Sequence, residues 1–235
     1  MQSKLDERLM SAVPYLTRGG RIADVGTDHA YLPAFLVSSG KCPAAIGSDV
    51  RDGPLMNAAA TLAVYHVTDT VRLLESDGLD AYAPDDADDF VFAGMGGTLI
   101  VELLERTSWI CDREKRFIFQ PMSHGELVRA FLLQKGFRIL DERACFDECR
   151  PYVAFSAAWE PEYRPRYRKS YIWMGELPNH LNEAASYYLT KQYVYLKQRA
   201  DALESASLLP DEVRVIREIL PDIEPYIRKK HKGES

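Results

Sequence analysis

The stretch Ala23-Asp24-Val25-Gly26-Thr27-Asp28-His29 decides the fold of this 235-residue chain. It closes a short apolar run at 21–25 and leads into a helix-like segment at 31–39. A strand that passes through a glycine turn into a helix is the building unit of open parallel α/β sheets, and such sheets bind ligands at the carboxyl ends of their strands. The stretch therefore predicts both the class of fold and the place of a functional site.

Beyond this turn, apolar runs alternate with helix-like segments. The runs lie at 44–50, 71–74, 90–93, 117–120, 137–140 and 153–159, and the helical patterns at 54–64 and 99–107. This alternation predicts an α/β fold with a mostly parallel sheet. The last two runs, joined by 141–152, predict an antiparallel pair that finishes the sheet. Before the first strand, apolar residues at helical spacing predict a helix over 4–18.

The composition changes after Trp159. A segment rich in Pro, Tyr and Arg follows, and apolar residues then recur at spacings of three and four along 189–203 and 213–227. These stripes predict an antiparallel, coiled-coil-like helical hairpin, in which Pro221 and Pro225 kink or break the second helix. We therefore expect a catalytic domain at 1–160, a linker at 161–181 and the hairpin at 182–235. Two ordinary helices packed on the sheet are the alternative.

Charge and composition limit the possible partners. The net charge of −6 argues against a general nucleic-acid binder, so an RNA site must be a local basic patch. The chain shows neither a signal peptide nor a run of about 18 apolar residues, so we expect a cytoplasmic protein with no membrane partner. The four cysteines lack paired Cys-x-x-Cys spacing, so no metal site is expected. The sequence leaves the oligomeric state open, and a monomer is compatible with it.

The first turn favours a cationic ligand. It has one glycine where a dinucleotide-binding turn has three, and it carries Asp24 and Asp28. Carboxylates beside a helix N-terminus would repel a pyrophosphate. They suit S-adenosylmethionine, which carries an ammonium and a sulfonium and no phosphate. A nicotinamide cofactor is therefore disfavoured.

The later strand ends extend this site. Asp49 follows the second strand, where a carboxylate can accept hydrogen bonds from ribose hydroxyls, and Asp77 follows the third, where it can face an adenine amino group. Glycines around Met95 let the chain pass close beneath a ligand. The predicted cofactor-binding residues are Asp24, Gly26, Thr27, Asp49, Val50, Asp77, Gly78, Ala93, Gly94, Met95 and Gly96. The alternatives are solvated strand ends, helix caps and a plain tight turn.

Five motifs in a fixed order resemble one family. They are 23–33 (ADVGTDHAYLP), 52–55 (DGPL), 77–79 (DGL), 93–97 (AGMGG) and 120–121 (QP). Together they resemble the bacterial tRNA (adenine-22, N1)-methyltransferase family. The resemblance implies a class I methyltransferase with a Rossmann-like sheet and a C-terminal coiled-coil hairpin, S-adenosylmethionine as cofactor and tRNA as partner. Met122 stands where the family usually has Asn after Gln-Pro.

Three residues near the first turn are candidates for catalysis. N1 of adenine carries a lone pair and needs no deprotonation, so the enzyme must align the base and stabilise developing charge. Asp28 would accept from the N6 amino group, His29 would help position the base, and Tyr31 would stack on it. The alternatives are Asp28 as a helix cap and Tyr31 as core packing.

Basic residues interleaved with tyrosines predict the RNA contact, namely Arg164, Arg166, Arg168 and Lys169. A solvated linker is the alternative, and a second basic group lies at 228–232. Two rival functions stay open. The chain could methylate another RNA, a small molecule or a protein, or it could be an inactive RNA-binding module.

Overall fold

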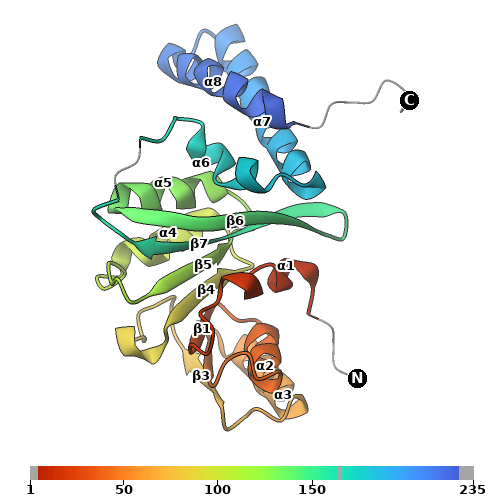
Figure 1. The fold of residues 1–235 in the computed structure, drawn as a ribbon, viewed down its shortest axis with the longest axis vertical. Helices are drawn as coiled ribbons and strands as arrows, with labels where there is room; N and C mark the ends of the chain where they lie inside the picture. Colours follow the sequence, from red (N-terminus) through yellow and green to blue (C-terminus); the bar gives the residue numbers. More distant parts are fainter. Residues whose placement is uncertain (1–4, 164–165, 228–235) are drawn as a thin grey trace.

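The computed structural model describes residues 5–163 and 166–227. Its seven-stranded sheet has the order β3-β2-β1-β4-β5-β7-β6 (Figure 1). The strands are β1 (Ile22–Val25), β2 (Ala45–Asp49), β3 (Val71–Glu75), β4 (Asp89–Ala93), β5 (Arg116–Gln120), β6 (Phe137–Asp147) and β7 (Arg150–Trp159). The first five are parallel, and β7 runs antiparallel to both β5 and β6. The predicted α/β class and the antiparallel ending are confirmed.

Helices cover both faces of the sheet. They are α2 (Tyr31–Ser38), α3 (Asp52–Val64), α4 (Gly97–Arg106) and α5 (Gly125–Lys135). The 3₁₀ turn η2 (Pro84–Asp86) precedes β4, and the short helix α6 (Tyr171–Met174) follows β7. Side chains alternate along β4: Phe90 and Phe92 join the hydrophobic cluster with α4 and α5, while Val91 joins the cluster with α2 and α3. Strands covered on both faces are buried throughout, which is why they appear as continuous apolar runs.

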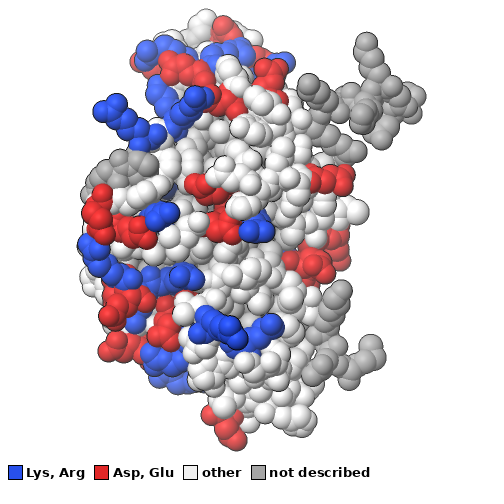
Figure 2. Space-filling view, in the orientation of Figure 1, with Lys and Arg blue, Asp and Glu red and all other residues white. Residues whose placement is uncertain are grey.

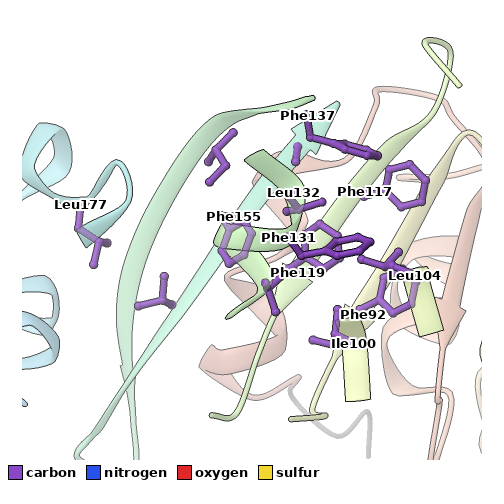
Figure 3. Close-up of a cluster of buried hydrophobic side chains, with 14 of the residues drawn as sticks. Phe92, Ile100, Leu104, Phe117, Phe119, Phe131, Leu132, Phe137, Phe155 and Leu177 are labelled. Atoms are coloured by element: carbon purple, nitrogen blue, oxygen red, sulfur yellow. The ribbon is translucent and has the colours of Figure 1, made fainter. Parts of the chain in front are cut away.

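The larger cluster is built on aromatic rings. Phe92, Phe117, Phe119 and Phe155 lie side by side on neighbouring strands (Figure 3), with ring centroids 5.3–6.4 Å apart where they meet. Each ring removes a large apolar area from water, which stabilises the fold. These strands consequently form a rigid base, and their carboxyl ends carry the predicted site.

Two predicted boundaries were wrong. In place of one helix over 4–18, the chain forms α1 (Glu7–Met10) and the 3₁₀ turn η1 (Val13–Tyr15). Pro14 lacks an amide N–H and its ring clashes with the preceding turn, which disfavours a continuous α-helix across this position. The segment 141–152 is mostly strand, because β6 and β7 pair up to a tight turn at Glu148 and Cys149, both at positive φ.

The C-terminal hairpin consists of α7 (Glu183–Ser205) and α8 (Pro210–Ile223), followed by η4 (Glu224–Tyr226). Helix α7 packs on β6 and β7, whereas α8 packs mainly on α7 (Figure 1). Pro221 is accommodated inside α8, and Pro225 lies in η4. The predicted linker contains α6 and η3 (Leu177–His180), with Leu177 fully buried. Because hairpin and sheet share one hydrophobic cluster, the domain boundaries stay a prediction.

Candidate active site

Two adjoining pockets lie at the carboxyl edge of the sheet, where the strand order reverses at β1. The β2 pocket, of about 450 Å³, is bordered by the ends of β2 and β3, and the α1 pocket, of about 290 Å³, lies beside α1 and the start of α2. Gly26, Asp28 and Gly94 line both. The two pockets therefore form one cleft at the topological switch point, the place where open α/β sheets bind ligands.

Ten of the eleven predicted cofactor-binding residues line this cleft. Those in the β2 pocket are Gly26, Asp49, Val50, Asp77, Gly78, Gly94 and Met95, and those in the α1 pocket are Asp24, Gly26, Thr27, Ala93 and Gly94. Gly96 caps α4 and lines neither pocket. The predicted catalytic residues Asp28, His29 and Tyr31 all line the α1 pocket.

Two glycines bring the backbone close to the cleft. Gly26 has φ +77°, and a Cβ there would lie 2.6 Å from Met95 Cε. Gly94 has φ +83°, and its Cβ would lie 3.2 Å from Arg8 Nη1. Side chains are disfavoured in this left-handed region, so both turns require glycine for their backbone conformation.

Asp24 is the buried acid of the cleft. Its Oδ2 accepts a 2.6 Å hydrogen bond from Thr27 Oγ1, and Thr27 Oγ1 accepts from Ala30 N at 3.1 Å. Burial raises the pKa of Asp24 to about 6, while the Thr27 hydrogen bond and the positive charge of Arg8 act to lower this pKa. The carboxyl therefore changes charge just below neutral pH.

Asp28 is not the helix cap. Helix α2 begins after Ala30, which adopts a left-handed conformation with φ 51°. The Ala30 amide donates its hydrogen bond to the Thr27 hydroxyl and not to Asp28. The Asp28 carboxylate instead lies 3.3 Å from His29 Nε2, with 66% of its side chain exposed. The capping alternative for Asp28 is wrong, and Asp28 instead lines both pockets of the cleft.

His29 and Tyr31 form a stacked pair. Their ring centroids lie 5.2 Å apart at an interplanar angle of 19°, and Tyr31 is 39% exposed. Tyr31 is therefore not a core residue, so the packing alternative is wrong. An aromatic surface of this kind can receive a planar base.

The acids of the β2 pocket differ in their surroundings. Asp49 is buried, and its Oδ1 accepts from Arg51 N at 2.9 Å. Asp77 is exposed and lies 2.7 Å from Arg106, which lowers its pKa. Val50, Leu99 and Met95 line the same pocket and add apolar surface. The pocket thus offers hydrogen-bond acceptors beside an apolar floor, as a nucleoside requires.

Some lining residues were missed from the sequence. Arg51 and Ser76 line the β2 pocket, and their neighbours Asp49 and Asp77 could have indicated them. Arg8 also lines the α1 pocket, although it lies in α1, which precedes the sheet. The sequence around Arg8 contains no motif that would have indicated a binding role.

Among the described residues of the predicted RNA cluster, Arg166, Arg168 and Lys169 lie outside the cleft. Arg168 pairs with Asp222 and Lys169 with Glu218, both at 2.6 Å, while Arg166 is exposed and Arg164 lies outside the described residues, as does the basic group at 228–232. On the face shown in Figure 2, Lys and Arg side chains lie among Asp and Glu side chains over the hairpin. These pairs fasten the segment to α8, and an RNA contact there stays a prediction.

Within residues 5–163 and 166–227, no three His, Cys, Asp or Glu side chains are grouped to hold a metal ion. In the same described ranges, no helix combines the length and apolarity needed to cross a membrane.

A carboxylate-lined cleft at the switch point, on a sheet finished by an antiparallel pair, is the arrangement of a Rossmann-like methyltransferase. The chain belongs to the methyltransferase domain family, which matches residues 5–155. This confirms the family resemblance of the sequence motifs at the level of the catalytic domain.

Individual relatives agree with this assignment. The tRNA (adenine(22)-N(1))-methyltransferase of Bacillus subtilis (strain 168) is 33% identical over 139 residues, which are 59% of this chain and 58% of that protein. The match thus spans less than two thirds of that relative. The crystal structure of the B. subtilis m1A22 tRNA methyltransferase TrmK shares the fold with a TM-score of 0.84 and 24% identity, covering 96% of this chain and 99% of that one. The structure of a Streptococcus pneumoniae protein in complex with S-adenosyl-L-methionine shares the fold with a TM-score of 0.78 and 26% identity. The match covers 92% of this chain and 100% of that one.

Proposed function

We propose that this protein transfers a methyl group from S-adenosylmethionine to N1 of an adenine in tRNA, at position 22. The observation that carries the proposal is the cleft itself, with acids at three strand ends and a stacked aromatic pair at its mouth. The similarity to tRNA (adenine(22)-N(1))-methyltransferase supports the choice of substrate.

The residues of the cleft fit this cofactor from end to end. Asp49 can accept hydrogen bonds from ribose hydroxyls, and Val50 and Met95 can hold an adenine ring. At the other end, the buried carboxylate of Asp24 matches an ammonium group. When bound, S-adenosylmethionine supplies an electrophilic methyl group on its sulfonium.

The substrate base is received by the residues after the first turn. A base within a helical stem is hidden, so it must be flipped out and stacked before it can react. The His29–Tyr31 pair offers the stacking surface, and Asp28 can accept from the N6 amino group. Because N1 attacks with its own lone pair, Asp28 stabilises the charge that develops on the base and does not act as a general base.

The test is methylation of unmodified tRNA with labelled cofactor, followed by nucleoside analysis. We expect label in 1-methyladenosine, and none in a matched tRNA that carries guanosine at position 22. Label in another nucleoside, or equal labelling of the matched tRNA, would refute the target. Absence of label with every tRNA tested would refute the tRNA activity.

One observation favours a second candidate. The basic residues predicted for RNA contact are partly neutralised by Asp222 and Glu218, and the net charge is −6. A methyltransferase for a small molecule or another RNA needs no such patch. Label recovered in a low-molecular-weight product, or in other RNAs as readily as in tRNA, would support this alternative. For the tRNA enzyme, the cytoplasm is the expected location.

A further inference from the structure

Arg106, the last residue of α4, holds the loop that follows β3. Its Nη2 donates to the backbone carbonyl of Asp77 at 2.6 Å and lies 2.7 Å from Asp77 Oδ1. Its Nε lies 3.3 Å from Asp80 Oδ1. Arg106 itself lines neither pocket of the cleft, so it can affect a ligand there only through the residues that it holds.

The backbone of this loop is also ordered from within. Ser76 Oγ donates to Gly78 O at 2.9 Å and accepts from Ala81 N at 3.1 Å. Gly78 adopts φ +62°, and a Cβ there would lie 2.5 Å from Leu103 Cδ2 on α4. The loop therefore has supports that do not include Arg106, whose particular contribution is the orientation of the Asp77 carboxylate.

Asp77 differs from the other charged residues that line the β2 pocket, which are Asp28, Asp49 and Arg51. Arg51 lies against Asp49 within the pocket, with its Nε 3.4 Å from Oδ1, and Asp28 borders the α1 pocket as well. Asp77 is held instead by an arginine outside the pocket. The hydrogen bond from Arg106 lowers the pKa of Asp77, so this carboxylate is ionised at neutral pH. In that form it accepts hydrogen bonds and donates none.

We propose that Arg106 is a positioning residue that holds Asp77 towards the amino group of the cofactor's adenine. The inference rests on the proposed function, because it concerns the cofactor of the same cleft. With Oδ1 held by Arg106, Asp77 Oδ2 can accept from the amino group, and no conformational entropy is lost in orienting the carboxylate on binding.

The fixed carboxylate makes the site selective for adenine over hypoxanthine. Hypoxanthine has an oxo group in place of the amino group, and a carboxylate held opposite that oxygen repels it. Hypoxanthine also carries a hydrogen on N1, which a carboxylate free to move can reach. Arg106 prevents that movement, so the strength of the preference for adenine depends on Arg106.

The test compares two ligands that differ in the purine base. Full-length wild-type protein, Arg106→Met and Arg106→Lys are titrated calorimetrically with S-adenosylhomocysteine and with S-inosylhomocysteine. The wild type should bind the adenine ligand about 10- to 100-fold more tightly, the scale of a charge-assisted hydrogen bond. Arg106→Met should lower this ratio about 2- to 5-fold, because exposed ion pairs are individually weak. Arg106→Lys keeps the charge without the fork of donors, so its ratio should lie between the two.

Arg72→Met is the matched control. Arg72 pairs with Asp86 at 2.9 Å, is partly exposed like Arg106, and lines neither pocket, so its loss should leave the ratio of affinities unchanged. A purely structural role of Arg106 would weaken both ligands by the same factor. That result, or a wild-type ratio in Arg106→Met, would refute the positioning role.

The wild-type titrations separate this inference from the proposed function. A wild type that binds both ligands alike would overturn the role of Asp77 and Arg106 and leave the cofactor standing. A wild type that binds neither ligand would overturn the proposed cofactor and this inference with it. Binding without tRNA methylation would overturn the tRNA activity and leave the Arg106 result standing.

Discussion

Thr27 Oγ1 donates a 2.6 Å hydrogen bond to the buried carboxylate of Asp24, and the same hydroxyl receives the amide of Ala30. One side chain thus orients the acid of the cofactor turn and satisfies an amide at the start of α2. The start of α2 is therefore linked through Thr27 to the Asp24 carboxylate, and Asp28 does not cap the helix.

The pKa of Asp24 gives cofactor binding a pH dependence. Burial raises this pKa to about 6, so the carboxylate that would bind an ammonium is lost as the pH falls through that value. We expect the affinity for S-adenosylmethionine to rise between about pH 5 and pH 7 and then level off. Calorimetric titrations across this range measure it. Asp24→Asn should bind weakly and without this rise, and an unchanged pH profile in the variant would exclude Asp24 as the cause.

The same shift has the opposite effect on folding. A carboxyl whose pKa is raised from 3.8 to about 6 stabilises the folded state below the unfolded value, and that stability is lost as the pH rises towards 6. The ligand-free protein should therefore lose this contribution mainly between about pH 4 and pH 6, a range that only partly overlaps the rise in cofactor affinity. Urea unfolding of wild type and Asp24→Asn at pH 4.5 and pH 7 tests this. The free energy of unfolding of the wild type should fall relative to that of Asp24→Asn at the higher pH, because only the wild type has a carboxyl to ionise there.

Asp49 should contribute to cofactor affinity through charge-assisted hydrogen bonds. We expect Asp49→Ala to weaken S-adenosylmethionine binding by roughly 1–3 kcal/mol. Asp69→Ala is the matched control, since Asp69 is exposed and lies in a turn before β3 away from both pockets. Calorimetry on both variants decides the matter. If Asp49→Ala binds S-adenosylmethionine as tightly as the wild type and Asp69→Ala do, Asp49 does not bind the cofactor.

Much of this site could be predicted because its signals are local. Asp24, Asp49 and Asp77 each follow an apolar run, and parallel strands bring their carboxyl ends to one edge. Arg8 could not be predicted in this way. It meets Gln120 across 112 positions of the chain, and a single arginine on a short helix has the pattern of a surface residue.

The fold errors have local physical causes. Pro14 interrupts an apolar pattern that by itself fits a helix. The outer parts of β6 and β7 are only half buried, so they carry polar residues that resemble a loop. The pairing of Arg168 and Lys169 with α8 depends on how the hairpin docks, which no local pattern specifies.

The buried pair Arg129–Glu142 should be the main electrostatic determinant of stability near the hairpin. Neither side chain is exposed, Arg129 Nη1 donates to Ile172 O at 2.9 Å, and Glu142 Oε2 accepts from Glu176 N at 2.9 Å. Glu142→Leu leaves a buried guanidinium unpaired, so we expect a loss of about 3–5 kcal/mol in the free energy of unfolding. Urea denaturation measures this loss.

A double variant separates the charge from the packing. Arg129→Met with Glu142→Leu removes both charges and should recover most of the lost stability. Arg113→Met, which breaks the exposed pair with Glu162, should leave the unfolding midpoint unchanged. A double variant as unstable as Glu142→Leu would show that shape, and not the unpaired charge, causes the loss.

Variants of Asp28 and Tyr31 test whether these residues of the α1 pocket take part in methyl transfer. If Asp28 stabilises charge only as the methyl group moves, Asp28→Asn should lower the single-turnover rate about 10- to 1000-fold, with little change in the binding of cofactor or tRNA. Because Thr27 and not Asp28 receives the Ala30 amide, the variant should keep α2 intact. Tyr31→Phe keeps the ring stacked at 5.2 Å on His29 and should cost little, whereas Tyr31→Ala should cost much more. Rates with saturating tRNA and cofactor measure all three. A near-normal Asp28→Asn rate would remove Asp28 from the chemical step, and equal losses for both Tyr31 variants would assign the role to the hydroxyl instead of the ring.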